Sequence, residues 1–496
     1  MDRAETISLL RGSTCFVDKE KTDCEMRLKH TEQIIEPRHP FKYCSTGREE
    51  AGKSLTSIVG SINHGGAIAL TGEWGTGKTT FLRMWKQSLE DQHYPTVLLN
   101  AWETEWAGDP LIAVIACIKR TCKQKESKEA LNDVISVARG FVQWPIQMAR
   151  TIGRAVVDHY AGEVSQAIEE LADQAFDKAV DSFDGRERSM ITLKGALEKL
   201  AWDVNQRSED GKPLVFIIDE LDRCRPDYAV RMLEVLKHFF VVRNIVFVCA
   251  VDKKHLEDSI CGFYGSEKIN AAEYLRRFFE LEINLPSPDY PKFCEHLYEY
   301  YQLAEFFESQ ERKQYSIFRN NPEDFKWFLS SLGVKKGLSL RQLERITAFT
   351  KLSLRNTGAR TYYYPTLSLF VTYLRFFDYQ FYAALKDHKW SCQELLDAFQ
   401  TGYLKLLDRK PNQYNSRSDH EAMILLLGKL IVSYNNDRET RSENIYDSTT
   451  KKTNLSPNES QIKKEELDRA IEYGNHGHDD YELSWLFRVL ELLRIS

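Results

Sequence analysis

The sequence lacks several features that mark specialised classes of protein. Its 496 residues contain no run of 18 apolar residues, which argues against a membrane-spanning helix. The ten cysteines form no CxxC pair and no Cys/His ligand spacing, so neither a zinc module nor a disulfide framework is indicated. Neither charge sign dominates, because 67 Lys and Arg face 73 Asp and Glu, for a net charge of −6. We therefore expect a cytoplasmic globular protein without overall attraction to nucleic acid.

The chain is long enough for several domains, and its composition changes along its length. Residues 1–45 are polar and end in a stretch with Pro and Gly, so we interpret them as an N-terminal arm. Up to residue 286, short apolar stretches then alternate with helical periodicities, which predicts a parallel sheet with helices on both faces. The five expected strands are AIALTG (67–72), TVLLN (96–100), LVFIID (214–219), NIVFVCAVD (244–252) and FELEINLP (279–286).

One interval in this pattern, from Lys78 to Asp219, is too long for a helix, a strand and a second helix. Residues of about 123–195 are therefore interpreted as a helical insertion. Within it, the segment 134–157 has an approximately helical apolar period and three arginines without an acidic residue between them. We expect this segment to pack against its own domain or a partner; the alternative is peripheral contact with anionic lipid.

After residue 286 the pattern becomes helical and rich in aromatic side chains. We expect a lid-like helical domain at 287–400, whose most apolar part is 361–385, and a C-terminal helical region at 401–496. Residues 433–466 carry few large apolar side chains, which predicts a disordered loop within that region.

The most specific motif is GEWGTGKT, from Gly72 to Thr79, which lies between an expected strand and an expected helix and fits the phosphate-binding loop pattern. Its glycines let backbone N–H groups face phosphates at a helix N-terminus. Lys78 is expected to reach the β- and γ-phosphates, and Thr79 to place its hydroxyl on Mg²⁺. The nucleotide-binding residues expected in this segment are Gly72, Gly75, Thr76, Gly77, Lys78, Thr79 and Thr80.

A second element supports the same site. LVFIIDELDR is an apolar strand that ends in Asp219 and Glu220, and carboxylates at this point can reach the magnesium ion and the attacking water. We assign Asp219 to the metal and Glu220 to the water, as the catalytic base. Asp222 and Arg223 either form an ion pair beside the site or only end the strand. DELD also matches a helicase motif, but no second set of short apolar strands follows residue 286.

Together with further motifs, these residues make the chain similar to the KAP family of P-loop NTPases. The likeness spans about residues 46–385 and is carried by GEWGTGKTTFLRMW, NAWETEW (100–106), VFIIDELDR, AVDKKHLEDSI, YLRRFFELEINLP and SLRQLERI (339–346). Glu220 replaces the second aspartate that the family often has, and the insertion is amphipathic and charged where many relatives carry transmembrane helices. The resemblance implies an α/β P-loop NTPase core at 46–286, with a central parallel five-stranded sheet, that uses ATP and Mg²⁺.

The resemblance also implies roles for residues outside the two main motifs. Asp252 matches a polar residue that senses the γ-phosphate in related NTPases; the alternative is a solvated carboxylate. Arg276 and Arg277 stand where AAA+-like proteins project an arginine finger into a neighbour's site; the alternative is a surface salt bridge. Arg341 matches a second phosphate sensor; the alternative is an ion pair with Glu344.

Two other groups of residues resemble binding sites but have simpler interpretations. Trp102 and Trp106 suggest stacking on a nucleobase, but we expect them to pack in the core at the end of a strand. HGHDD (476–480) has no third ligand at a recognised spacing, so we interpret it as a solvated turn and not as a metal site.

We predict a magnesium-dependent ATPase that uses its nucleotide state as a conformational or assembly switch. ATP is preferred over GTP because no NKxD-like guanine motif follows the relevant strands. Bacterial members of the family are associated with phage exclusion and defence. By this resemblance we expect a bacterial anti-phage defence ATPase that works with a separate effector or partner protein, since the chain has no nuclease, deaminase or protease constellation. Self-association is expected because an arginine finger would act in a neighbour's site. The alternatives are a nucleotide-gated scaffold that scarcely hydrolyses ATP and a DNA-stimulated motor; the acidic charge balance argues against the motor.

Overall fold

The computed structural model describes most of the chain. The described ranges are 35–62, 64–122, 129–138, 190–206, 211–266, 268–356, 364–404, 419–438, 442–475 and 483–492. Three expectations fall wholly or mainly outside these ranges: the N-terminal arm, most of the insertion including residues 139–157, and the HGHDD turn.

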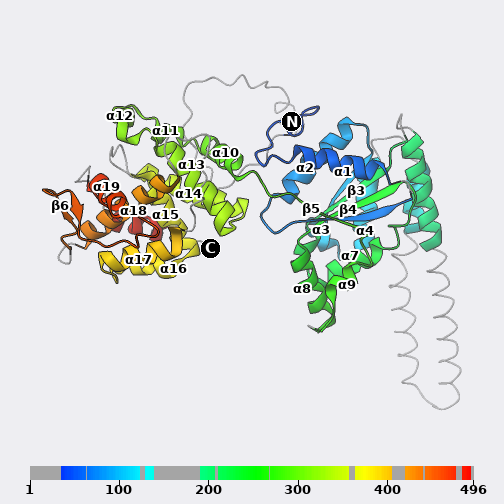
Figure 1. Ribbon diagram of the computed structural model, residues 1–496. Helices are drawn as coiled ribbons and strands as arrows, with labels where there is room; N and C mark the ends of the chain where they lie inside the picture. Colours follow the sequence, from blue (N-terminus) through cyan, green and yellow to red (C-terminus); the bar gives the residue numbers. More distant parts are fainter. Residues whose placement is uncertain are drawn as a thin grey trace, which may run out of the picture. The chain divides into compact units, whose positions relative to one another are not determined.

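A five-stranded parallel sheet forms the centre of the α/β core, as the sequence predicts (Figure 1). The strand order is β2-β3-β4-β1-β5, so the first and third expected strands are separated by the fourth. The strands of the sheet are β1 (Gly66–Thr71), β2 (Thr96–Asn100), β3 (Leu214–Asp219), β4 (Ile245–Val251) and β5 (Leu281–Asn284). β1, β3 and β4 are buried along their whole length, as expected for parallel strands that are covered on both faces.

The register of the sheet aligns the carboxyl ends of its strands at one edge. Thr71, the last residue of β1, lies opposite Val251 of β4, and Asn100 of β2 lies opposite Asp219 of β3. The glycine loop that follows β1 therefore opens at the edge where β3 and β4 end. This is the edge at which ligands bind in open α/β sheets.

Helices cover both faces of the sheet, because side chains alternate between the faces along each strand (Figure 1). Val215 and Ile217 of β3 pack toward α1 (Glu49–Gly60) and α2 (Lys78–Asp91), whereas Phe216 and Ile218 join the core on the opposite face. The helices on that opposite face are α4 (Pro110–Cys122), α7 (Pro226–Leu236) and α8 (Lys253–Tyr264). Shorter elements complete this half: α3 (Ala101–Thr104), η2 (Glu105–Ala107), η3 (Leu221–Arg223) and α9 (Ala271–Leu275).

The described parts of the expected insertion are helical and belong to this core. Residues 129–138 and 190–206 form helices, and Val134 and Leu197 are buried in the cluster that covers the second face of the sheet. In the described residues 134–138, the apolar side chains of this period therefore pack in the core. Within the described ranges, no helix combines the length and the apolarity that crossing a bilayer requires.

The described residues after Pro286 are mainly helical and share one contiguous hydrophobic core. This core runs from Phe293 to Leu490 and is rich in buried aromatic side chains, so the regions expected at 287–400 and 401–496 pack together. The helices are α10 (Tyr290–Tyr300), α11 (Ala304–Phe307), α12 (Gln310–Lys313), η4 (Ser316–Phe318), α13 (Asn321–Lys336), α14 (Leu340–Asn356), α15 (Pro365–Phe377), α16 (Tyr379–Lys386), α17 (Cys392–Tyr403), α18 (Asp419–Asp437), α19 (Lys464–Asn475) and α20 (Leu483–Leu492).

The prediction of a disordered loop at 433–466 was wrong for its described residues, which exclude 439–441. Helix α18 continues to Asp437, and an antiparallel hairpin follows, made of β6 (Tyr446–Asp447) and β7 (Lys452–Thr453). Ile445 is buried, and Thr453 Oγ1 donates a hydrogen bond to its carbonyl oxygen at 2.6 Å. Hydrogen bonds to backbone groups stabilise this segment. The prediction of disorder relied on the number of apolar residues, which takes no account of such bonds.

Candidate active site

The glycine loop between β1 and α2 adopts the turn that its motif predicts. Gly75 and Gly77 have φ values of +78° and +87°, in the left-handed region that favours glycine. Gly77 is also the N-cap of α2, so the N–H groups of the first helical turn face the loop. The chain therefore has the backbone of an anion-binding helix N-terminus at this edge of the sheet.

Lys78 begins α2, and its side chain folds over the loop. Its Nζ donates to the carbonyl oxygens of Gly72 at 2.6 Å and Glu73 at 3.2 Å, and lies 4.0 Å from Oδ2 of Asp222. Burial lowers the pKa of Lys78, whereas the charge of Asp222 acts in the opposite direction. A desolvated ammonium group held on loop carbonyls is well placed to exchange them for phosphate oxygens.

Thr79 and Asp219 supply a pair of oxygen donors that fits a magnesium ion. The Thr79 hydroxyl is hydrogen-bonded to the Asp219 carboxylate. Burial raises the pKa of Asp219 to about 6, although the bond from Thr79 opposes this shift. A divalent cation would compensate this buried carboxylate, and Mg²⁺ prefers such oxygen ligands together with phosphates and water. Among the described residues, no group of three His, Cys, Asp or Glu side chains suits another metal.

Glu220, the predicted base, has an unusual backbone conformation and two side-chain partners. Its φ of +59° is uncommon for a residue with a side chain. Oε2 accepts a hydrogen bond from Asn100 Nδ2 at 3.0 Å, and Oε1 lies 2.9 Å from Nη1 of Arg223. Asn100 is itself fixed, because its Oδ1 caps α3 by accepting the N–H of Glu103. Arg223 therefore pairs with Glu220 and not with Asp222, contrary to the ion pair considered from the sequence.

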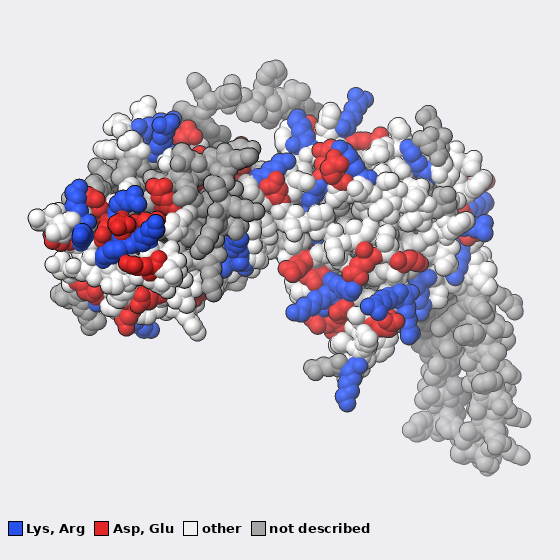
Figure 2. All heavy atoms as spheres, in the orientation of Figure 1, with Lys and Arg blue, Asp and Glu red and all other residues white. Residues whose placement is uncertain are grey.

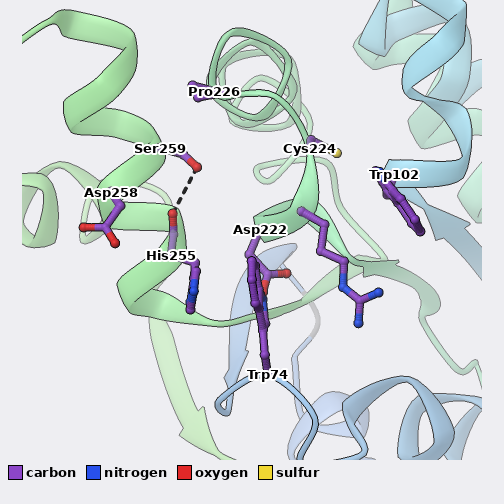
Figure 3. Close-up of a pocket in the computed structure, with 9 residues that line it drawn as sticks. Trp74, Trp102, Asp222, Cys224, Pro226, His255, Asp258 and Ser259 are labelled. Carbon is purple, nitrogen blue, oxygen red and sulfur yellow. Dashed lines mark hydrogen bonds between the residues drawn. The ribbon is translucent and has the colours of Figure 1, made fainter. Parts of the chain in front are cut away.

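Two buried aspartates, Asp222 and Asp252, connect the loop to the ends of β3 and β4. Figure 3 shows the first of them, Asp222, beside Trp74. Asp222 Oδ2 accepts hydrogen bonds from the indole N–H of Trp74 and from the backbone N–H of Asp252, the latter at 3.0 Å. Asp252 Oδ2 accepts the backbone N–H of Trp74 at 2.9 Å. The Trp74 ring stacks on His255 with 3.6 Å between ring centroids. Asp252 is thus a buried loop contact and not a solvated carboxylate, and its role as a phosphate sensor stays a prediction.

The prediction that Trp102 and Trp106 pack in the core was wrong. They are 51% and 87% exposed, because the chain leaves the sheet at Asn100 and turns into α3 and η2 at its edge. Each lines a cavity beside the site. One cavity, of about 480 Å³, has Trp102 and Trp74 in its wall (Figure 3). The other, of about 280 Å³, has Trp106 in its wall together with Thr79 and Asp219.

Arg276 and Arg277 lie away from the loop of their own chain. They precede β5, whose residue Leu281 pairs with Ile68 of β1, so they stand toward the opposite edge of the sheet. The Arg276 side chain is 73% exposed and pairs with Glu273 at 2.9 Å. A role on the phosphoryl group therefore requires a second copy of the chain, and such a role stays a prediction.

Arg341 lies beside the loop, at the start of α14. A Cβ atom added to Gly75 would lie 3.4 Å from Cβ of Arg341 and 2.8 Å from Oγ of Ser339. The first turn of α14 therefore contacts the glycine loop directly. This contact does not decide whether Arg341 is a second phosphate sensor, and that role stays a prediction.

Arg48 is a loop contact that the sequence analysis missed. Its side chain is buried, Nη1 donates to the Thr76 carbonyl oxygen at 2.6 Å, and Nε donates to the Pro286 carbonyl oxygen at 2.9 Å. Arg48 stands just before the first residue of α1 and belongs to no motif. No signal in a single sequence marks it as part of the site.

The comparisons with known proteins agree with this geometry. A model of the KAP family P-loop domain matches residues 50–359, which confirms the resemblance seen in the motifs. No curated protein matches the sequence.

Several solved structures are similar to this chain at low identity. A chain in the structure of Drosophila ORC bound to DNA has a TM-score of 0.37 and 14% identity, over 91% of this chain and 88% of that chain. For Cdc6p from Pyrobaculum aerophilum, the TM-score is 0.33 and the identity is 11%, over 94% of this chain and 88% of that chain. The Aeropyrum pernix ORC2 protein, in ADPNP-ADP complexes, has a TM-score of 0.36 and 13% identity, over 90% of this chain and 97% of that chain.

Proposed function

Because the chain belongs to the KAP family of P-loop NTPases, we propose that it binds ATP with Mg²⁺ and hydrolyses the bond between the β- and γ-phosphates. One observation carries this proposal. A single edge of the sheet gathers the buried Lys78 ammonium, the hydrogen-bonded pair of Thr79 and Asp219, and the restrained carboxylate of Glu220. These groups are those that phosphoryl transfer to water needs: a cation for the phosphates, oxygen donors for a metal and a base for the nucleophile.

The residues divide the work of hydrolysis as follows. Lys78 balances negative charge on the β- and γ-phosphates, and the loop N–H groups orient them. Thr79 and Asp219 would hold Mg²⁺, which would neutralise charge on the phosphate oxygens. Glu220 accepts a proton from water as the water oxygen attacks the γ-phosphorus and the bond to the β-phosphate oxygen breaks. Asn100 and Arg223 hold the two oxygens of Glu220 and so set its direction.

Hydrolysis in this proposal drives a conformational or assembly switch. The contact between the loop and the first turn of α14 supports this part, because a movement of the loop would reach residues outside the α/β core. An arginine finger from a second copy, Arg276 or Arg277, would make assembly part of the cycle. Family resemblance alone supports a place in bacterial anti-phage defence, with a separate effector protein.

The alternative scaffold function keeps the same nucleotide site but predicts almost no turnover. The DNA-motor alternative has less support. Among the described residues on the face shown in Figure 2, basic and acidic side chains are intermixed without a continuous basic stripe. The whole chain carries a net charge of −6.

Binding and hydrolysis of ATP by the full chain test the proposal. Wild type is expected to bind labelled ATP with Mg²⁺, Lys78→Ala to lose binding, and Glu220→Gln to bind but lose at least about 100-fold in rate. Lys86→Ala is the matched control, because Lys86 lies on the same helix and pairs with Glu90 at the surface. Wild type without ATP binding, or Lys78→Ala with full affinity, would overturn the proposal.

Two further results separate the alternatives. Wild type that binds ATP but shows no turnover above Glu220→Gln would support the scaffold. Mass measurement with and without ATP tests assembly. A dimer or ring that forms only with ATP would support a finger from Arg276 or Arg277, and a monomer in both conditions would exclude it.

A further inference from the structure

Arg48 carries a buried positive charge that no carboxylate balances among the described residues. It is 3% exposed, and its two hydrogen bonds go to backbone carbonyl oxygens. Burial lowers the pKa of Arg48 to about 10, and the groups that act against this shift are Cys44 and Tyr290, neither of which is a carboxylate. Burying an ion without a counter-ion is unfavourable. A cation kept in such a place beside a phosphate-binding loop indicates an anionic ligand nearby.

One arm of Arg48 orients a peptide group of the loop. Nη1 donates to the carbonyl oxygen of Thr76 at 2.6 Å. The Thr76 C=O and the Gly77 N–H belong to the same planar trans peptide, so they point in opposite directions. Holding the carbonyl oxygen on Arg48 therefore turns the Gly77 N–H away from Arg48. None of the hydrogen bonds in the described part of the chain uses this N–H, which leaves it available to a phosphate.

The other arm of Arg48 holds the segment that leaves the sheet. Nε donates to the carbonyl oxygen of Pro286 at 2.9 Å. The same two stretches of chain are joined by a backbone bond from the N–H of Asp289 to the carbonyl oxygen of Thr46, at 3.1 Å. Pro286 follows β5 and precedes α10, the first helix of the C-terminal helical region. A single guanidinium group thus connects the phosphate-binding loop to the start of that region.

We propose that Arg48 is a positioning residue that orients the Thr76–Gly77 peptide for phosphate binding and couples the loop to the segment 286–290. It acts through backbone groups and does not touch the reacting atoms. This inference rests on the proposed function and deepens it, because it names the route by which nucleotide state reaches the helical region. The role is one of binding, so it affects ATP and ADP alike and leaves the chemical step unchanged.

The test compares the full-length wild type with Arg48→Met, Arg48→Lys and the control Lys53→Met. Lys53 lies on α1, exposed and paired with Glu49 and Glu50, so its loss is expected to change nothing. Calorimetric titration with Mg²⁺ and ATP is expected to give Arg48→Met an affinity at least about tenfold lower, the range for hydrogen bonds to charged groups. KM rises by the same factor while kcat stays within about twofold. Arg48→Lys keeps the charge and one donor, so it recovers part of the affinity.

Hydrogen–deuterium exchange tests the coupling separately. In wild type, ATP is expected to slow exchange both in the loop, residues 72–80, and in residues 286–293. In Arg48→Met at saturating ATP, protection of the loop remains and the change at 286–293 is lost. The same change at 286–293 in both proteins would overturn the coupling.

Other results would overturn the positioning role. Wild-type affinity in Arg48→Met would do so. An equal loss of affinity in Arg48→Met and Arg48→Lys, accompanied by a lower melting temperature in both variants, would also do so. If wild type binds ATP in a Lys78-dependent manner and Arg48→Met binds it with the same affinity, only this inference fails. If wild type does not bind ATP, the proposed function fails and the inference fails with it.

Discussion

Asn100 Nδ2 donates a hydrogen bond to Oε2 of Glu220 at 3.0 Å, between the ends of two neighbouring strands. The register of the sheet produces this pair, because Asn100 lies opposite Asp219 and Glu220 is the next residue. With Arg223 on the other carboxylate oxygen, Glu220 is held on both sides. The direction of the predicted base therefore depends on a residue of the NAWETEW motif, whose function the motif alone does not reveal.

Asn100→Asp is expected to lower the rate of ATP hydrolysis by about tenfold or more and to leave ATP affinity nearly unchanged. The new carboxylate repels Glu220 from its position, but it still caps α3, since Asp is as good an N-cap as Asn. Phosphate release, ATP titration and a thermal melt measure the three effects. Asn100→Ser, which keeps a cap but removes the donor to Glu220 without adding a charge, separates loss of the hydrogen bond from the repulsion. An unchanged rate in Asn100→Asp would show that this contact does not orient the base.

Binding of ATP in the presence of Mg²⁺ is expected to weaken as the pH falls through about 6. Burial raises the pKa of Asp219 from 3.8 to about 6, so a proton competes with the metal for this carboxylate in that range. The folded chain binds this proton more tightly than the unfolded chain. The contribution of Asp219 to metal-free stability is therefore full below pH 3.8 and is lost as the pH rises through about 6.

Titrations of ATP between about pH 5 and pH 8, with and without Mg²⁺, measure this dependence. Asp219→Asn is expected to bind more weakly and to lack the step near pH 6. A metal-dependent affinity that stays constant across this range in wild type would contradict the assignment of Asp219 to the metal.

Trp74→Phe is expected to weaken ATP binding by about 3- to 30-fold, because the buried Asp222 loses the indole N–H that it accepts. The phenyl ring can keep its stack on His255, so the variant isolates the hydrogen bond. Calorimetry with ATP gives the affinity. Trp202→Phe is the control, since Trp202 is 56% exposed in a helix at the base of the insertion. Equal affinities in both variants would rule out a role for this bond in shaping the loop.

Gly428→Ala is expected to reduce the free energy of unfolding by about 1–3 kcal/mol. A Cβ atom on Gly428 would clash with the carbonyl oxygen of Ala470, so α18 and α19 would have to move apart. Gly402→Ala is the matched control. It lies in α17 with nothing within 4 Å of the added atom, and alanine there is expected to be neutral or stabilising by up to about 1 kcal/mol. Urea unfolding compares the two variants, and equal midpoints would argue against close packing of α18 on α19.

The predictions from sequence were best where the necessary residues are contiguous. The phosphate-binding loop is one stretch of eight residues, and each buried parallel strand is a continuous apolar run, so both could be predicted from local pattern. The ordered segment around Thr453 and the exposure of Trp106 could not. The first depends on polar contacts to backbone groups. The second depends on where the chain leaves the sheet, which apolar content does not indicate.

The sequence by itself determined that the protein has a phosphate-binding loop, five parallel strands and acidic residues after the third of them, because each of these is encoded locally. Only the tertiary structure decided which side chains meet. Arg48 and Thr76 are 28 residues apart, Asn100 and Glu220 are 120, and Trp74 and Asp222 are 148. Strand order and register bring these pairs together, and a single chain read in order carries no direct record of either.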